Sequence, residues 1–398
     1  MKYLFYMFLF LVIISCGDGK EKQNGKGLSN VVEIDIRQLP VKNLFSYKRP
    51  IDNCRFVPLE TTDESLIGEI DKVCVEGDLI FVKDDKKDLF TFSMSGKFLN
   101  KIGSVGQGGE ELISFVDFYV NKEKGYVGIF DVLKSKMLRF SFDGKYISSH
   151  SCAKEMNESY NIVGIIGDDL LLGMRNNKDS QYAYITVSEN DYSITGSYLP
   201  YPVIGSVSST PMRSIAGYST HGFYVTAQFS DSVYQFSDKN IAEPILTVRS
   251  DLKVVNPKLL SELNAMDLET DFDAGPILRD RGFSVGLSSI YVAGTFLNVH
   301  YPLPNYQSAD IFYSIKRGKA YRSTANRSDF FGQGWGPALT TTDEEIVYGM
   351  EADRIIELKD EADLFVNKEV LEPIKNVEEF DNPVLVFFSS GLDFADDD

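Results

Sequence analysis

Residues 78–98 (DLIFVKDDKKDLFTFSMSGKF) are followed by a second stretch of the same pattern, residues 125–146 (GYVGIFDVLKSKMLRFSFDGKY). Each stretch has two apolar, strand-like runs and then a turn with glycine followed by lysine. Gly96 and Gly144 of these turns lie 48 residues apart, and glycine is favoured there because a reversing backbone adopts positive φ. A strand-and-turn unit with a period near 48 residues is typical of the blades of a β-propeller.

Four weaker copies of this unit follow, which brings the expected number of blades to six. They are residues 161–199, 214–248, 282–325 and 338–358. We therefore predict an all-β fold, a six-bladed β-propeller of four-stranded antiparallel blades. Residues 257–271 (PKLLSELNAMDLETD) have their apolar side chains at helical spacing, and we expect one short helical insertion there, between blades four and five.

The two ends of a ring must be joined, because an open blade leaves unpaired strand edges. Propellers solve this by combining strands from both ends of the chain in one blade. Residues 54–60 (CRFVPLE) and 384–388 (VLVFF) are both strand-like, and we predict that they pair.

The chain begins with a segment that predicts export. Lys2 precedes an apolar run over residues 3–14, which is short for a membrane span and has the form of a secretory signal. The run ends in residues 13–16 (IISC), which resemble the lipobox of bacterial lipoproteins. This resemblance implies that Cys16 is acylated and becomes the first residue of the mature chain. The alternative is an uncleaved signal in which Cys16 has no special role.

These features divide the chain into four parts. Residues 1–15 are the predicted lipoprotein signal peptide, 16–30 a flexible tether, 31–390 the propeller and 391–398 an acidic tail. The strand-like alternation begins at Val31. The expected location is the bacterial cell envelope, on the periplasmic or the surface side of the outer membrane.

The composition limits which partners the protein can bind and how many disulfides it can form. The formal charge of −18 repels phosphate backbones and anionic headgroups, so we expect no nucleic-acid partner and no membrane contact except through the lipid. The three cysteines besides Cys16 permit at most one disulfide, and whether Cys54 and Cys74 pair is left open.

Further motifs give the chain a family resemblance. Residues 101–112 (KIGSVGQGGEEL) and the following 116–120 (VDFYV) resemble NHL repeats, although Gly109 stands where a proline is usual. With the lipobox, residues 56–60 (FVPLE) and 382–386 (NPVLV), the mature chain resembles the six-bladed β-propeller lipoproteins of Bacteroides-type bacteria. The resemblance implies a propeller in the envelope and transfers no catalytic residue.

Other motifs are interpreted as structural. The glycine loop 103–109 lacks the Gly-Lys-Ser/Thr ending of a phosphate-binding loop, and no helix follows it, so we interpret it as an interblade crossover. His150, His221 and His300 are far apart in sequence, and we expect loop histidines rather than a metal site. We expect no metal and no cofactor.

The long crossovers between blades are the best candidate for a functional surface, because such segments share one face of a propeller. Here they span residues 200–213, 250–281 and 323–337. They contain arginines and aromatic residues, which stand out in an acidic chain and are common at binding hot spots. The residues selected as ligand-binding are Tyr201, Arg213, Arg281, Arg327 and Trp335. The alternative is that the arginines pair with nearby acids and that Trp335 fills its loop.

Three classes of function follow from this reading. The first is an envelope-tethered lipoprotein whose propeller binds a ligand or a protein partner, with no catalysis expected. The second is a propeller enzyme, a lyase or hydrolase, with a metal ion in the central channel. The third is a scaffold bound permanently to another envelope protein.

Overall fold

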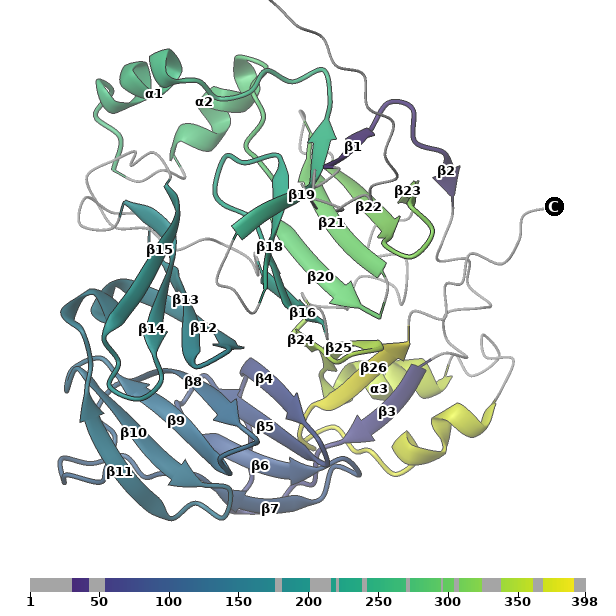
Figure 1. Cartoon of the computed structure of the whole chain (residues 1–398). Helices are drawn as coiled ribbons and strands as arrows, with labels where there is room; N and C mark the ends of the chain where they lie inside the picture. Colours follow the sequence, from purple (N-terminus) through teal and green to yellow (C-terminus); the bar gives the residue numbers. More distant parts are fainter. Residues whose placement is uncertain are drawn as a thin grey trace, which may run out of the picture.

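The computed structural model shows six β-sheets arranged in a ring (Figure 1). It describes residues 31–42, 54–175, 181–200, 216–219, 222–237, 242–269, 273–294, 296–303, 308–323, 338–360 and 368–389. The predicted signal peptide, Cys16, the tether and the acidic tail lie outside these residues. The expected six-bladed β-propeller is confirmed.

Blades one to three follow the chain in order, and in each the first strand is innermost. Blade one contains β4 (Ile70–Glu76), β5 (Leu79–Asp84), β6 (Leu89–Ser93) and β7 (Phe98–Lys101). Blade two contains β8 (Phe115–Asn121), β9 (Tyr126–Asp131), β10 (Lys136–Ser141) and β11 (Tyr146–Ser151). After the 3₁₀ turn Lys154–Glu158, blade three contains β12 (Ser159–Ile166), β13 (Asp169–Met174), β14 (Tyr182–Ser188) and β15 (Ile194–Pro200).

Blades four and five each receive an additional strand from the N-terminal segment. Blade four contains β16 (Ala216–Ser219), β17 (Gly222–Val225), β18 (Ser232–Phe236) and β19 (Ala242–Arg249), with β1 (Val32–Asp35) parallel to β19. Blade five contains β20 (Ser289–Ala293), β21 (Phe296–Pro302), β22 (Ser308–Ser314) and β23 (Lys319–Ser323), with β2 (Val41–Lys42) parallel to β23. The expected helical insertion between these blades contains α1 (Pro257–Asn264), and a second helix, α2 (Ala274–Asp280), follows beyond the expected residues 257–271.

Blade six is built from both ends of the described chain. It contains β24 (Thr340–Thr341), β25 (Glu345–Met350), β26 (Val384–Ser389) and β3 (Cys54–Pro58). Strands β26 and β3 are antiparallel, with Val384 opposite Pro58 and Phe388 opposite Cys54. The predicted pairing of the two ends is therefore confirmed.

The connection between β25 and β26 differs from the expectation. Residues 354–358 (RIIEL) were expected to be part of a blade, but they lie in α3 (Ala352–Asp360), which is followed by the 3₁₀ segment Lys368–Ile374. Ile355 and Leu358, three positions apart, are buried against β3 and β26. Their spacing fits the face of a helix as well as it fits a strand, so the short apolar run was ambiguous.

The blades pack through apolar side chains on both of their faces. All six residues of β9 are buried, and Val127 and Ile129 pack with Phe81 and Phe118 between blades one and two. Because the sheets are covered on both sides, middle strands such as β5, β9 and β13 are nearly continuous apolar runs, whereas the outer strands β7, β11 and β15 are partly exposed. In the described part of the chain, Cys54 and Cys74 are not joined by a disulfide.

The two glycines that reveal the repeat have equivalent roles. The backbone φ is +82° at Gly96 and +81° at Gly144. A Cβ at Gly96 would lie 1.9 Å from the carbonyl oxygen of Pro58, and one at Gly144 would lie 2.8 Å from that of Lys101. Each hairpin therefore needs glycine both for its conformation and for its approach to the outer strand of the preceding blade.

Candidate functional site

The glycine-rich segment after β7 is a structural crossover, as expected. Val105 and Leu112 form a parallel β-bridge across it. The Lys134 ammonium group donates hydrogen bonds to the carbonyl oxygens of Gly108 at 2.7 Å and Glu111 at 2.6 Å. These bonds hold the crossover against blade two.

An ion pair joins the inner strands of blades one, two and three, near the centre of the ring in Figure 1. Lys72 Nζ lies 2.8 and 2.9 Å from the two carboxylate oxygens of Asp117. It also donates to the carbonyl oxygens of Phe118 at 3.0 Å and Ile162 at 2.9 Å. Asp117 in turn accepts hydrogen bonds from the backbone N–H groups of Phe118 and Ile162. Both charges are thus satisfied by the protein, which indicates a structural role.

A second polar network joins blades two and three. Glu189 accepts hydrogen bonds from Asn121, Lys124 and Tyr126, and the Tyr119 and Tyr192 hydroxyls lie 2.9 Å apart. Burial opposes ionisation of Glu189, but these hydrogen bonds lower its pKa below the usual value. Its carboxylate therefore contributes to stability above the ordinary pKa of glutamate, and this contribution is lost on acidification.

The histidines and acids do not form a metal site in the described residues. No group of three or more His, Cys, Asp or Glu side chains there could hold a metal ion. His150 lies on β11 and His300 lies on β21, so neither of them is the loop histidine that was expected. His300 Nδ1 lies 2.9 Å from Asp310 Oδ1, while His221 is outside the described residues.

Of the residues selected as ligand-binding, Arg281 belongs to the described part of the chain. Tyr201, Arg213, Arg327 and Trp335 lie outside the described residues. Arg281 follows α2 and donates from Nη1 to Glu262 Oε2 at 3.1 Å, which is the local pairing weighed as the alternative. The selected set as a whole stays a prediction.

A cavity of about 820 Å³ lies on the face where the chain crosses from one blade to the next, between blades three and four. Its wall includes Leu199 and Pro200 at the end of β15, the loop from β17 to β18, and Ser250 after β19. Two of the three long crossovers predicted to form a binding face therefore begin at this cavity.

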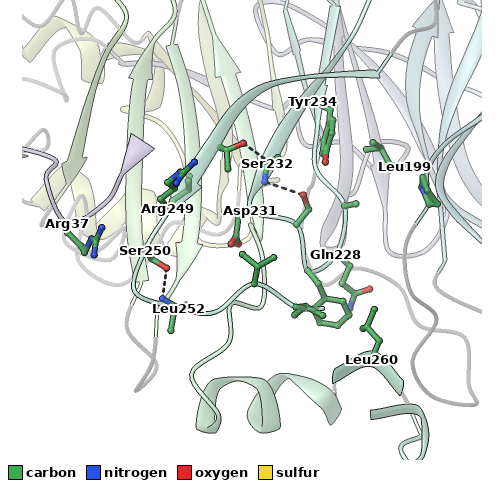
Figure 2. Close-up of a pocket in the computed structure, with 18 residues that line it drawn as sticks. Arg37, Leu199, Gln228, Asp231, Ser232, Tyr234, Arg249, Ser250, Leu252 and Leu260 are labelled. Atoms are coloured by element: carbon green, nitrogen blue, oxygen red, sulfur yellow. Dashed lines mark hydrogen bonds between the residues drawn. The ribbon is translucent and has the colours of Figure 1, made fainter. Parts of the chain in front are cut away.

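The cavity has an apolar side and a polar side. Leu252, Val255 and Leu260 line the apolar side, and Leu260 belongs to α1. On the polar side the Ser232 and Thr247 hydroxyls lie 2.9 Å apart. Figure 2 shows Asp231 near the middle of the labelled residues, with Gln228 and Leu260 on one side and Arg37 and Arg249 on the other.

The two arginines at the cavity rim are engaged by acids. Arg37 lies 2.6 Å from both Asp35 and Asp251, and Arg249 pairs with Glu33. The hydrogen bond from Arg37 lowers the pKa of Asp35 to about 2. The rim cations are thus largely neutralised by the carboxylates of Asp35, Asp251 and Glu33.

Asp231 differs from these acids, because no arginine or lysine among the described residues pairs with it. It is half-buried, and burial raises the pKa of its carboxyl group while a hydrogen bond from Ser284 Oγ only partly opposes the rise. The Tyr301 hydroxyl donates to Ser284 Oγ at 3.2 Å and lies 2.8 Å from Ser250 Oγ. A chain of three hydroxyl groups therefore leads from the crossover to this carboxylate.

The loop that carries Asp231 is held rigidly. The backbone N–H of Val248 donates to the Asp231 carbonyl at 2.8 Å, and that of Leu287 donates to the Ser230 carbonyl at 2.9 Å. Gly286 has φ +81°, and a Cβ there would lie 2.7 Å from the Ser230 nitrogen. The cavity is preformed on this side, because the loop is fastened to both β19 and the start of blade five.

Sequence reasoning did not select Asp231. It lies in the hairpin loop between β17 and β18, whose sequence around the aspartate (FSDS, residues 229–232) is ordinary for a turn. Its burial arises from the crossover and blade five, so a local sequence signal for it is missing.

Comparison with known proteins places the chain in a family. A family model matches residues 31–389, which include all six blades. The chain belongs to the DUF4934 family. That family is described as a domain of unknown function, so membership assigns the DUF4934 propeller no activity. No curated protein matches the chain.

Two solved structures support the fold. A "Putative exported protein" from Bacteroides fragilis NCTC 9343 is 15% identical, covers 90% of this chain and 98% of its own, and has a TM-score of 0.67. A member of the DUF4221 family from Bacteroides vulgatus ATCC 8482 is 11% identical, covers 84% of this chain and 95% of its own, and has a TM-score of 0.52. At these identities the likeness concerns the DUF4934 propeller fold alone.

The stability of an Asp231→Asn variant tests the description of this carboxylate. A raised native pKa means that the native state binds more protons than the unfolded state, so this group's contribution to stability falls as pH rises from about 3.9, the ordinary value. We expect Asp231→Asn to melt no lower than the wild type near neutral pH, because asparagine can still accept the Ser284 hydrogen bond. Thermal denaturation at several pH values measures this.

Asp117→Asn is the control, since breaking a buried ion pair costs about 3–5 kcal/mol and should lower the melting temperature. A comparable loss in Asp231→Asn at neutral pH contradicts the description.

Proposed function

We propose that this protein is a lipid-anchored binding module of the bacterial cell envelope, which captures a small ligand in the cavity of blade four. The observation that supports this proposal is the cavity. Its volume of about 820 Å³ falls within the ~300–1,000 Å³ of ligand sites. It combines an apolar wall with a few converging polar groups, as such sites do, and its loop is fixed in advance.

The proposed anchor lies close to this cavity along the chain. The tether, residues 16–30, ends next to β1 on the outer edge of blade four, and Arg37 just after β1 lines the cavity. A flexible tether of this length spans on the order of 20 Å. An acylated Cys16 would therefore hold the cavity near the membrane surface. Among the described residues, no helix has the length and apolar character needed to cross a bilayer.

A Cys16→Ala variant tests the anchor. Several acyl chains on one residue give durable membrane attachment, at about 0.8 kcal/mol per buried methylene. We expect the wild-type chain in the membrane fraction of a bacterium that processes lipoproteins, and the variant in the soluble fraction. Mass spectrometry of the N-terminal peptide identifies the lipid. Equal fractionation of both chains, or an unmodified thiol in the wild type, contradicts lipid anchoring.

A cavity-filling variant tests ligand capture. The probes are monosaccharides, amino acids, aliphatic and aromatic amines, and short fatty acids, each screened by thermal shift. A ligand at 100 times its dissociation constant stabilises a protein by about 2.7 kcal/mol, so we expect at least one class to raise the melting temperature. Ser232→Trp, which fills the cavity, should abolish that shift.

Ser149→Trp is the matched control, because Ser149 is also a half-buried serine on a strand, in β11 of blade two. It should retain the shift. A ligand response that survives Ser232→Trp, or no response to any class, contradicts the proposal.

A further inference from the structure

We infer that the cavity of blade four takes a ligand with a protonated amine on an apolar body, and that the amine binds the Asp231 carboxylate. This inference rests on the proposed function and names the chemical class of its ligand. It follows from three observations: Asp231 has no cationic partner among the described residues, the hydroxyl groups beside it donate toward it, and one wall of the cavity is apolar.

The first argument is that Asp231 has no cationic partner among the described residues. From the described residues its carboxylate accepts one side-chain hydrogen bond, from Ser284 Oγ. The cationic residues on the described cavity wall are Arg37 and Arg249, and both form ion pairs with other carboxylates. A half-buried carboxylate loses part of its hydration, which is costly without a counter-charge, and a cationic ligand would supply that charge.

The second argument is the polarity of the hydroxyl chain. Tyr301 has a single hydroxyl proton, which it donates to Ser284 Oγ, so Ser250 must donate to Tyr301. Ser250 Oγ itself accepts from the backbone N–H of Leu252 at 3.1 Å. The hydroxyl protons of Ser250, Tyr301 and Ser284 therefore all point toward Asp231. This orientation favours the ionised form of the Asp231 carboxyl group.

The hydroxyl chain reaches only one carboxylate oxygen. Ser284 Oγ donates to Asp231 Oδ1, while Oδ2 accepts no hydrogen bond from the residues that the structure describes. A carboxylate can accept about four hydrogen bonds. Asp231 therefore retains acceptor capacity for the N–H groups of an ammonium ion in the cavity.

The third argument is the apolar wall. Leu252, Val255 and Leu260 form an apolar wall on one side of the cavity, which fits a hydrocarbon body. An ion pair beside such a wall is less exposed to water and therefore stronger than in bulk solvent. Tyr234 also lines the cavity, and aromatic rings attract cations. The net charge of −18 also attracts cations and repels anionic ligands.

Two probes that differ only in the charged group test the inference. They are 2-phenylethylamine and 2-phenylethanol, titrated into the full chain in detergent and followed by ligand-observed NMR. We expect the amine to bind about tenfold tighter near neutral pH, a difference of about 1.4 kcal/mol. Its affinity should decrease on acidification through the raised pKa of Asp231, as the carboxylate becomes protonated.

Two variants locate the effect. Asp231→Asn should remove the preference for the amine, whereas Asp251→Asn, which changes an exposed rim carboxylate paired with Arg37, should keep it. Equal binding of both probes to the wild type, a preference that survives Asp231→Asn, or no binding of the amine overturns the inference. If both probes bind equally and Ser232→Trp abolishes both, the amine assignment fails while the proposed binding function stands.

Discussion

The pairing of β3 with β26 is the constraint on which the rest of this structure depends. Each blade buries apolar side chains on both faces, so a ring that stayed open would expose one face of blade one and one of blade six. The closing strand is reinforced by its side chains. Arg55 forms two hydrogen bonds with Glu345, at 3.0 and 2.9 Å, and lies 3.6 Å above the Phe387 ring. The last residue of β3, Pro58, also lies in close contact with the Gly96 turn of blade one.

The segment that closes the ring also shapes the cavity. Before it reaches blade six, the N-terminal segment adds β1 to blade four and β2 to blade five, so three successive blades contain an N-terminal strand. Ile34 and Ile36 are buried in the core between blades four and five, and Arg37 comes directly after them at the cavity rim. Fold closure and the geometry of the proposed binding site therefore depend on the same stretch of chain.

The sequence predicted those features that have local signals. The turn glycines, the 48-residue period and the apolar strands led to six blades, and the strand-like ends led to the closing pair. The parallel pairing of β1 with β19 could not be predicted, because the pattern of VVEIDI indicates a strand without identifying its partner. The cavity lies where two of the predicted crossovers begin, and the binding role of that face stays a prediction. Asp231 was missed because its burial and its isolation from cations arise only when blades four and five are packed together. Most residues selected on that face lie outside the described part of the chain.

A cross-link between β3 and β26 tests the central claim most directly. Phe388 lies opposite the native Cys54, so Phe388→Cys should form a disulfide between positions 54 and 388 on mild oxidation, detected by mass spectrometry of unreduced peptides. The neighbouring Phe387→Cys, whose side chain points to the other face of the sheet and whose partner is Arg55, should not link to Cys54. Formation of the 54–388 bond in the folded chain is the result that ring closure predicts. Its absence, or equally efficient linking from position 387, would contradict the closure.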